Sequence, residues 1–450
     1  HDDHQHDDHS HAGHSHAGHG HAGHHHDHQI GTEREDDGVN RRGFLECMAW
    51  AGTGVVWAIS GGVPKAFAMN AIDKLSDAEK KTLFFAQISD SHIGFNKAAN
   101  TDVTATLRLA VDRLNALPTP PALVLHTGDI TQLSKPEEFD TANEVIKGIK
   151  TGEVFFVPGE HDVLSDNGAQ YLNRFGRKSS KGYYSFDHTG VHFIGLVNVM
   201  DLKAGGLGAL GAEQLDWLKK DLQPLATSTP IVVFAHIPLW TIYPEWGWGT
   251  DDSAQALALL KRFGSVTVLN GHIHQTMQKV EGNVHFHTAF STAFPQPAPG
   301  SAPSPGPMTV SADRLRHVLG STTITFVPGK HNLAIVDSTL TGEVAMAGSM
   351  AMEQATGKPK RLDNSKQAPG TISIDNFQFN PKVATVKAGT EVTWINRDDV
   401  PHLVISANGK FASSRTLDTD QKFTTKFNTP GEFLYFCSLH PQMTAKIIVT

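Results

Sequence analysis

Short apolar runs alternate with helix-like stretches from Thr82 onward, and five of these runs lead directly into a polar motif containing Asp, Glu or His. The five runs are residues 83–89, 123–126, 154–157, 231–235 and 266–269. Their length and their content of β-branched and aromatic residues are typical of buried strands. Strands separated by helices pair in parallel, and their carboxyl ends then meet at one edge of a sheet, where ligands usually bind. The pattern predicts an α/β domain with polar side chains gathered at that edge.

Two helices and a long loop are predicted around these strands. Ser134 is placed to cap a helix by accepting a backbone N–H, with Glu137 reaching back to the cap. A second helix opens near residues 250–252 and stops at Gly264. Residues 295–307 carry six prolines and predict an extended loop. Because further strand-like runs follow, this loop is an insertion within the first domain; the further runs are 190–197, 283–287, 323–327 and 333–337.

After Pro369 apolar and polar residues alternate, so that apolar residues recur at every second position. Four short strands separated by turn residues are predicted there, at residues 371–375, 391–395, 422–427 and 446–450. Alternating strands of this length predict a small all-β sandwich over residues 370–450. The polar stretch 342–369 has no clear period and is interpreted as the linker between the two domains.

Length and composition limit the interpretation further. A chain of 450 residues is too long for one typical domain, which favours two domains with tails. The net charge of −8 gives no basic surface for a phosphate backbone, so nucleic-acid binding is not expected. Thirteen of the 27 histidines lie between His1 and His28. The segment 1–39 is predicted to be a disordered tail that binds zinc, copper or nickel, with a purification tag as the alternative.

Residues 40–68 have the features of a targeting segment. Asn40–Leu45 contains Arg41-Arg42 and resembles the twin-arginine export signal, and a weakly apolar run follows it. Ala66-Phe-Ala68 offers the small residues that a signal peptidase reads. Cleavage there predicts a periplasmic protein without a stable membrane span, whereas a retained signal would act as an anchor. Because the histidine tail precedes this signal, either the tail handles metal on the cytoplasmic side or the signal is retained.

The polar motifs after the five apolar runs contain the donor types of a metal site. In chain order they are Asp90-Ser-His92, Gly128-Asp129, Gly159-Glu-His-Asp162, His236 and Gly271-His-Ile-His274. Together they supply enough oxygen and nitrogen atoms for two adjacent metal ions. Their order resembles that of the calcineurin-like metallophosphoesterases over residues 82–341. The resemblance implies a four-layer α/β/β/α fold that hydrolyses phosphate esters.

The resemblance also implies a role for each polar residue. One metal ion would be held by Asp90, His92 and His274, and the other by His236 and His272. Asp129 would bridge the two ions, which are Fe, Mn or Zn and share a hydroxide that attacks phosphorus. His161 would stabilise the leaving oxygen or donate a proton to it, with Asp162 fixing its ring.

Position 160 departs from the family pattern. The family has Asn in this motif, where the side-chain carbonyl binds the second metal, whereas this chain has Glu160. A glutamate is still able to ligate, but it adds a negative charge to the site. The substitution therefore bears on the rate, the metal preference and the reaction type. The histidines outside these motifs, among them His126, His192 and His287, are interpreted as structural or surface residues.

A second donor set lies near the C-terminus. Cys437, His440 and Met443 follow one another at intervals of three residues, and His402 precedes them. A thiolate, two imidazoles and a thioether are the ligands of a type 1 copper site. Residues 370–450 resemble the cupredoxins here, and the spacing is that of the amicyanin-like group. If Cys47 leaves with the signal, Cys437 is the last remaining thiol and an internal disulfide is excluded.

These observations lead to two functional hypotheses. The first is an exported dinuclear-metal phosphoesterase that hydrolyses a phosphomonoester or phosphodiester and is fused to a copper domain. That domain either passes electrons, to the dinuclear site or to a redox partner, or only binds copper. The alternative is a copper-binding or electron-transfer protein whose phosphoesterase fold is a weakly active scaffold. The aromatic residues that follow His236 are either ordinary loop packing or a wall that stacks on an ester group; they are Trp240, Tyr243, Trp246 and Trp248.

Overall fold

The computed structural model describes most of the chain beyond Thr82 and one hairpin before it. The described residues are 55–60, 63–68, 82–177, 179–203, 206–327, 333–344, 370–375, 377–407, 409–437 and 443–450. The predicted histidine tail, most of the predicted signal segment and most of the predicted linker lie outside these residues. Within the predicted signal segment, β1 (Val55–Ser60) and β2 (Val63–Ala68) form an antiparallel pair. The described residues contain no helix that is long and apolar enough to cross a membrane.

A five-stranded sheet forms one half of the α/β region, in the order β13-β12-β3-β4-β5. Strands β3, β4 and β5, which lead into polar motifs, are parallel to one another. Strands β12 and β13 run antiparallel to their neighbours. The bounds are β3 (Leu83–Ile88), β4 (Leu123–His126), β5 (Glu153–Phe156), β12 (Gly320–Phe326) and β13 (Ala334–Thr339). Because β12 pairs with β3, the proline-rich loop before it is an insertion within this domain, as predicted.

A six-stranded sheet forms the other half, in the order β10-β11-β9-β8-β7-β6. Its four inner strands are parallel, and antiparallel strands close both edges. The bounds are β6 (Tyr184–His188), β7 (Val191–Gly195), β8 (Ile231–Ala235), β9 (Val266–Asn270), β10 (Gln278–Glu281) and β11 (Val284–Thr288). The sequence predicted that all motif-bearing strands share one sheet edge. In the structure β3, β4 and β5 belong to one sheet, whereas β8 and β9 belong to the other.

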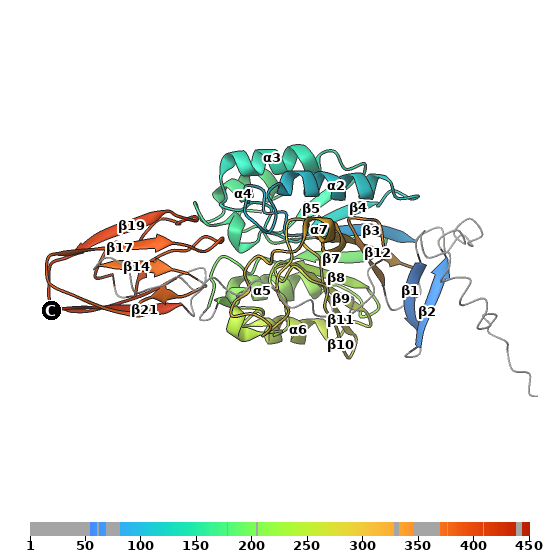
Figure 1. Cartoon of the computed structure of the whole chain (residues 1–450). Coiled ribbons are helices and arrows are strands. Elements are labelled where there is room, and N and C mark those ends of the chain that lie inside the picture. The colour runs from blue at the N-terminus through green and yellow to red at the C-terminus, as the bar shows by residue number, and fades with distance from the viewer. Residues whose placement is uncertain are drawn as a thin grey trace, which may run out of the picture. The chain divides into compact units, whose positions relative to one another are not determined.

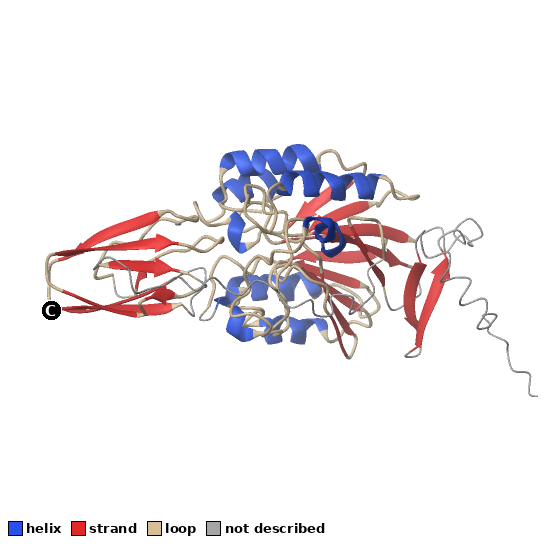
Figure 2. Ribbon diagram, viewed as in Figure 1, coloured by secondary structure: helices blue, strands red, loops and turns tan. Residues whose placement is uncertain are grey.

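The two sheets pack face to face between two layers of helices (Figure 2). Apolar side chains from both sheets interdigitate, as in the edge-to-face contact of Phe85 with Phe193 at 5.3 Å between ring centroids. The first sheet is covered by α2 (Val103–Asn115), α3 (Pro136–Ile146) and α4 (Ala169–Phe175). The second sheet is covered by α5 (Gly211–Leu222) and α6 (Ser253–Leu260), and α7 (Ala312–Val318) precedes β12 (Figure 1). This is the predicted α/β/β/α sandwich.

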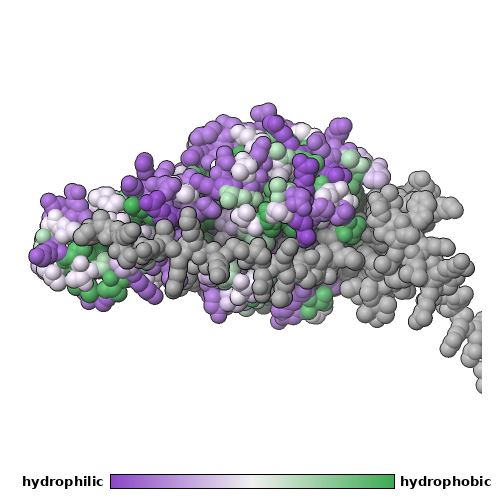
Figure 3. Space-filling model, in the orientation of Figure 1, coloured by the Kyte–Doolittle hydropathy of each residue, from purple (hydrophilic) through white to green (hydrophobic). Residues whose placement is uncertain are grey.

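Helix α2 shows why these segments fold as they do. Val103, Leu107 and Leu114 recur at helical spacing and are buried against the sheet. The Asp102 side chain accepts a hydrogen bond from the Ala105 N–H at 2.9 Å and caps the first turn. The opposite face is polar, and hydrophilic side chains dominate the outer surface over α2 and α3 (Figure 3).

The predicted start of helix α3 was wrong by one residue. Lys135 occupies the cap position, and Glu138 accepts the Leu133 N–H at 2.8 Å and the Lys135 N–H at 3.4 Å. The reason is Pro136, which occupies the first helical position and holds the preceding residue in the extended conformation that a cap requires. Ser134 instead accepts the Ser165 N–H at 2.8 Å.

The C-terminal region is a β-sandwich, as predicted. Its sheets have the orders β15-β14-β17-β19 and β16-β21-β20-β18. Trp394, Tyr435 and Ile447 pack between the sheets and are fully or almost fully buried. The bounds are β14 (Thr371–Ile374), β15 (Phe379–Asn380), β16 (Val383–Val386), β17 (Thr390–Asn396), β18 (Ile405–Ser406), β19 (Lys422–Phe427), β20 (Gly431–Phe436) and β21 (Thr444–Val449).

Candidate metal sites

The polar motifs of both α/β sheets converge at the carboxyl ends of their strands. Among the described residues, four sets of donor atoms lie close enough together to hold a metal ion, and neighbouring sets share residues. The sets are Asp90–His92–His274, Asp90–Asp129–His236, Glu160–His236–His272 and His92–Asp129–His161. All seven residues that were predicted as ligands of the first two metal ions therefore meet in one place.

The ring nitrogens of three histidines are oriented by fixed acceptors. His92 Nδ1 lies 2.9 Å from Gln132 Oε1, and His236 Nδ1 lies 2.7 Å from the Thr127 carbonyl. His274 Nδ1 lies 2.6 Å from the Phe294 carbonyl. A carbonyl accepts only from a protonated nitrogen, so each Nδ1–H donates and each ring turns its Nε2 toward the carboxylates of the cluster.

Asp129 lies between the two halves of the cluster. Its Oδ2 atom is 3.5 Å from His92 Nε2 and 3.3 Å from His236 Nε2. Its Oδ1 atom accepts the His161 N–H at 2.9 Å, which fixes the carboxylate in this orientation. A carboxylate so placed is able to give oxygen to an ion on each side.

Glu160 occupies the second half of the cluster. Its two carboxylate oxygens lie 2.9 Å from His236 Nε2 and 2.9 Å from His272 Nδ1. Although these atoms are close, Glu160 Oε2, His236 Nε2 and His272 Nδ1 are buried and have no partner of hydrogen-bond geometry within the described part of the chain. One carboxylate oxygen and two imidazole nitrogens that lie within 4.8 Å of one another have the type and spacing of metal ligands, so the residues present fit a bound cation.

The backbone around the cluster adopts conformations that non-glycine residues rarely take. Positive φ angles occur at Asp90 (53°), His92 (42°), Asp129 (51°), His272 (71°) and His274 (53°). Such conformations persist where the surrounding structure holds them, and they concentrate at functional sites. Glycine is also required at position 271, directly before His272, because a Cβ atom there would lie 2.1 Å from Ser89 Oγ.

Burial and charge act in opposite directions on the acidic ligands. Burial raises the pKa of Asp90, but the neighbouring His274, His236 and His92 outweigh it and hold that pKa below its usual value. Burial also raises the pKa of Glu160, and His272 and His236 again shift it downward. The cluster therefore holds buried carboxylates in their charged form, which requires compensating positive charge.

The 3₁₀ turn η4 (Glu160–Asp162) directs the side chains of His161 and Asp162 into different surroundings. His161 lines the pocket beside His92, and its Nδ1 lies 2.8 Å from the Gln132 carbonyl. The prediction that Asp162 fixes this ring was wrong. The Asp162 carboxylate accepts the backbone N–H groups of Ile130, Thr131 and Gly159 at 2.9–3.1 Å, because the tight turn directs it into the loop after β4.

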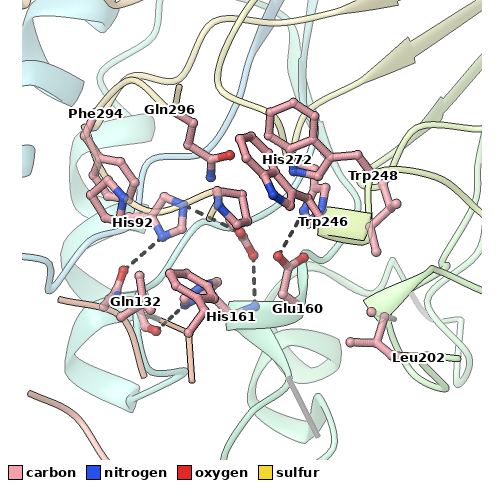
Figure 4. Close-up of a pocket in the computed structure, with 17 residues that line it drawn as sticks. His92, Gln132, Glu160, His161, Leu202, Trp246, Trp248, His272, Phe294 and Gln296 are labelled. Atoms are coloured by element: carbon pink, nitrogen blue, oxygen red, sulfur yellow. Dashed lines mark hydrogen bonds and ion pairs between the residues drawn. The ribbon is translucent and has the colours of Figure 1, made fainter. Parts of the chain in front are cut away.

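Gln132 is a site residue that the sequence interpretation missed. Its side chain accepts from His92, and its carbonyl accepts from His161, so one residue orients two imidazoles (Figure 4). The sequence offered one indication of this role, namely that Gln132 lies three residues after Asp129. A single glutamine in a loop, however, does not by itself indicate a metal site.

Aromatic side chains line the pocket next to the cluster. Trp246, Trp248 and Phe294 line it together with Leu202 and Gln296 (Figure 4). The predicted aromatic group therefore divides. Trp240 packs against Phe286 in the core, at 5.0 Å between ring centroids, whereas Trp246 and Trp248 face the pocket.

Three of the four predicted copper ligands lie in the described part of the β-sandwich, and His440 lies outside the described residues. His402, Cys437 and Met443 are all buried. His402 Nδ1 is 3.6 Å from Cys437 Sγ, which also accepts the Leu403 N–H at 3.4 Å. The Cys437 N–H donates to the Met443 carbonyl at 3.1 Å and ties together the two ends of the ligand loop. A buried thiol and imidazole in this proximity, with a thioether on the same loop, fit a copper ion.

Asp398 is the second residue that the sequence interpretation missed. Its Oδ2 atom lies 2.8 Å from His402 Nε2. Burial lowers the pKa of His402, but the bonds to Asp398 and Cys437 outweigh it and raise that pKa to about 9. The sequence offered one indication of this role, a carboxylate four residues before the proposed ligand His402. The surrounding residues are typical of an ordinary polar turn.

Comparison with known proteins gives two families. A family model described as calcineurin-like phosphoesterase matches residues 85–276, and one described as cupredoxin-like domain matches residues 328–449. The chain is 27% identical over 217 residues to a 3',5'-cyclic-nucleotide phosphodiesterase from Nostoc sp., which covers 46% of this chain and 77% of that protein. It is 31% identical over 115 residues to amicyanin-alpha from Methylorubrum extorquens, which covers 24% of this chain and 97% of that protein. A dimetal phosphatase structure from Danio rerio matches 56% of this chain and 98% of its own, at 15% identity and a TM-score of 0.38.

Proposed function

Because the chain belongs to the calcineurin-like phosphoesterases and, in its C-terminal part, to the cupredoxins, we propose that it hydrolyses phosphate esters at a dinuclear metal centre and carries a type 1 copper site. The observation that carries the first half is the position of Asp129 Oδ2, within 3.5 Å of His92 Nε2 and 3.3 Å of His236 Nε2. The second half is supported by the buried His402, Cys437 and Met443.

The ligand assignment follows from the donor sets. Asp90, His92 and His274 would hold one ion, and Glu160, His236 and His272 the other, with Asp129 shared. Bound divalent or trivalent ions supply Lewis acidity and an activated water to such a site. Fe, Mn and Zn all accept this mixture of imidazole and carboxylate ligands.

His161 is the residue that acts on the leaving group in this proposal. It lines the pocket, and the bond from its Nδ1 to the Gln132 carbonyl fixes the orientation of the ring. Burial lowers its pKa, but the Asp129 and Glu160 carboxylates outweigh that effect and raise the pKa of His161 above its ordinary value. A protonated imidazole at the pocket wall is suited to donate a proton to a departing ester oxygen.

We propose a diester with an aromatic group as the preferred substrate. Trp246, Trp248 and Phe294 form an apolar wall beside the cluster, and aromatic faces stack on planar rings. The similarity to a phosphodiesterase that acts on cyclic nucleotides supports a ring of this kind. Export by the twin-arginine route to the periplasm is part of the same proposal and rests on Asn40–Leu45.

A copper-handling protein with a weakly active phosphoesterase scaffold is the second candidate. Glu160 favours it, because a third carboxylate at the cluster reduces the attraction for an anionic ester.

Hydrolysis assays distinguish the two candidates. The purified chain, loaded with Mn²⁺, would be assayed with nitrophenyl phosphate monoester and bis-nitrophenyl phosphate diester. The proposal predicts metal-dependent turnover with a higher kcat/KM for the diester, and a rise in KM for the diester in Trp246→Ala. A full complement of bound metal without turnover of either ester would instead support the scaffold.

A further inference from the structure

We propose that Asp398 is a positioning residue of the copper site, which orients His402 toward Cys437 and favours the oxidised state of the bound copper. This inference rests on the type 1 copper site proposed above. It adds a residue outside the ligand set and a prediction for the reduction potential.

The imidazole of His402 is held from both of its nitrogens. Nε2 lies 2.8 Å from Asp398 Oδ2, and Nδ1, on the other side of the ring, lies 3.6 Å from Cys437 Sγ. A carboxylate oxygen accepts from a ring N–H, so Nε2 carries a proton and Nδ1 is the nitrogen that faces Cys437. The ring is fully buried, so bulk solvent does not compete with the carboxylate for Nε2.

Asp398 is itself held in place by its neighbours. Its Oδ2 also accepts the Phe377 N–H at 2.8 Å, and its own N–H donates to Asn396 Oδ1 at 3.0 Å. The Asn396 amide in turn donates to the carbonyls of Val400 and Leu417 at 2.8 and 2.9 Å. The carboxylate is therefore oriented by neighbouring backbone and side-chain groups, and only 8% of the residue is exposed.

A charged acceptor on a ligating imidazole has a predictable effect. It increases the basicity of the ring, and its negative charge stabilises the more highly charged Cu(II) relative to Cu(I). Burial makes this interaction stronger than it would be in water. Asp398 should therefore lower the Cu(II)/Cu(I) potential.

The test compares Asp398→Asn with Asp399→Asn in the full chain loaded with Cu(II). Both substitutions remove one negative charge from adjacent positions, but Asp399 is exposed and Asp398 holds the bond to His402. Asp398→Asn should weaken the preference for Cu(II) over Cu(I) about tenfold, which raises the potential by about 59 mV for one electron. Asp399→Asn should change it much less. The thiolate-to-copper absorption and the Cu(II) EPR spectrum should change in Asp398→Asn alone.

Three results would overturn the inference. They are an unchanged potential in Asp398→Asn, an equal shift in both variants, and spectra that do not respond to either. If Asp398→Asn fails to take up copper, Asp398→Glu is the deciding variant, because it keeps the negative charge. The inference then requires a blue Asp398→Glu protein with a potential near that of the unsubstituted chain. A colourless Asp398→Glu protein contradicts the inference. A chain that is colourless with Cu(II) before any substitution would show that the proposed copper site itself is wrong.

Discussion

At the scale of single residues, the two proposed metal sites depend on the residues that orient the candidate ligands as much as on those ligands. Gln132 orients His92 and His161, and Asp398 orients His402. The ligand types were predictable because Asp, His and Cys follow strands at characteristic spacings. The orienting groups were not, because a glutamine or an aspartate in a turn has many ordinary uses. Asp162 was predicted to contact His161 because the two are adjacent in sequence, but its carboxylate bonds Thr131 instead.

Replacing His161 should separate catalysis from metal binding. His161→Gln should lower kcat by about 10²–10⁴-fold, the usual contribution of a general acid, at unchanged metal content. Steady-state kinetics with the nitrophenyl diester, together with metal analysis, measures both quantities. Asp162→Asn is the comparison, because it loosens the loop after β4 and should reduce metal content as well. A His161→Gln protein as active as the unsubstituted chain would exclude His161 from catalysis.

Replacing Glu160 tests the effect of its charge. Glu160→Asn removes one negative charge from a cluster that contains Asp90, Asp129 and Glu160. The site should then attract an anionic ester more strongly and acidify its activated water more, so kcat/KM for diesters should rise about tenfold near neutral pH. The ascending limb of the pH profile should move to lower pH for the same reason. An unmoved profile at equal metal content would show that Glu160 has no such influence.

At the scale of elements, strand positions were predictable and their division between sheets was not. Apolar runs that end in polar motifs identify β3, β4, β5, β8 and β9 by pattern alone. The same pattern occurs in both sheets, so periodicity does not reveal that two sheets face each other. Helix α3 adds a second example: the propensity of Ser134 for capping was outweighed by the conformation that Pro136 imposes on Lys135.

The β6–β7 hairpin is joined to α5 by a charged cluster with a pH-dependent effect on stability. His192 lies 2.9 Å from Asp221 and 2.8 Å from Asp187. Burial lowers the pKa of His192, but these bonds outweigh it and raise that pKa above the model-peptide value of 6.5. A raised folded-state pKa means that the stabilisation is complete below about pH 6.5 and is lost as the pH rises through the folded pKa.

Asp221→Asn should therefore reduce stability at low pH and much less at high pH. We expect a loss of about 1–2 kcal/mol in the free energy of unfolding at pH 6 and a smaller loss at pH 9. Urea unfolding followed by tryptophan fluorescence measures this difference. Asp201→Asn is the control, because Asp201 is exposed and pairs only with Lys203 among the described residues. An equal loss for Asp221→Asn at both pH values would contradict the protonated state assigned to His192.

At the scale of the whole molecule, the chain combines a calcineurin-like phosphoesterase domain with a cupredoxin-like domain, and the two proposed metal sites use separate ligand sets. The α/β/β/α sandwich supplies the first set and the β-sandwich supplies the second. Cys437→Ser should abolish the blue colour of the Cu(II) protein and leave the metal content of the first site unchanged. Absorption spectroscopy and metal analysis measure both outcomes. A protein that remains blue after this substitution would refute Cys437 as the copper ligand.

The metal content of Asp129→Ala tests the central claim, a dinuclear site bridged by Asp129. The unsubstituted chain, loaded with Mn²⁺, should bind close to two equivalents, as expected for a dinuclear site. Mn²⁺ is used because the histidine tail is predicted to bind zinc, copper or nickel. Asp129→Ala should lose both equivalents because the carboxylate serves both ions, whereas His274→Ala should weaken mainly one. Asp337→Ala is the matched control, because Asp337 is a buried carboxylate of the same domain that bonds His287 instead. Loss of both equivalents in Asp129→Ala with retention in Asp337→Ala is the predicted result, and full metal content in Asp129→Ala would contradict the account.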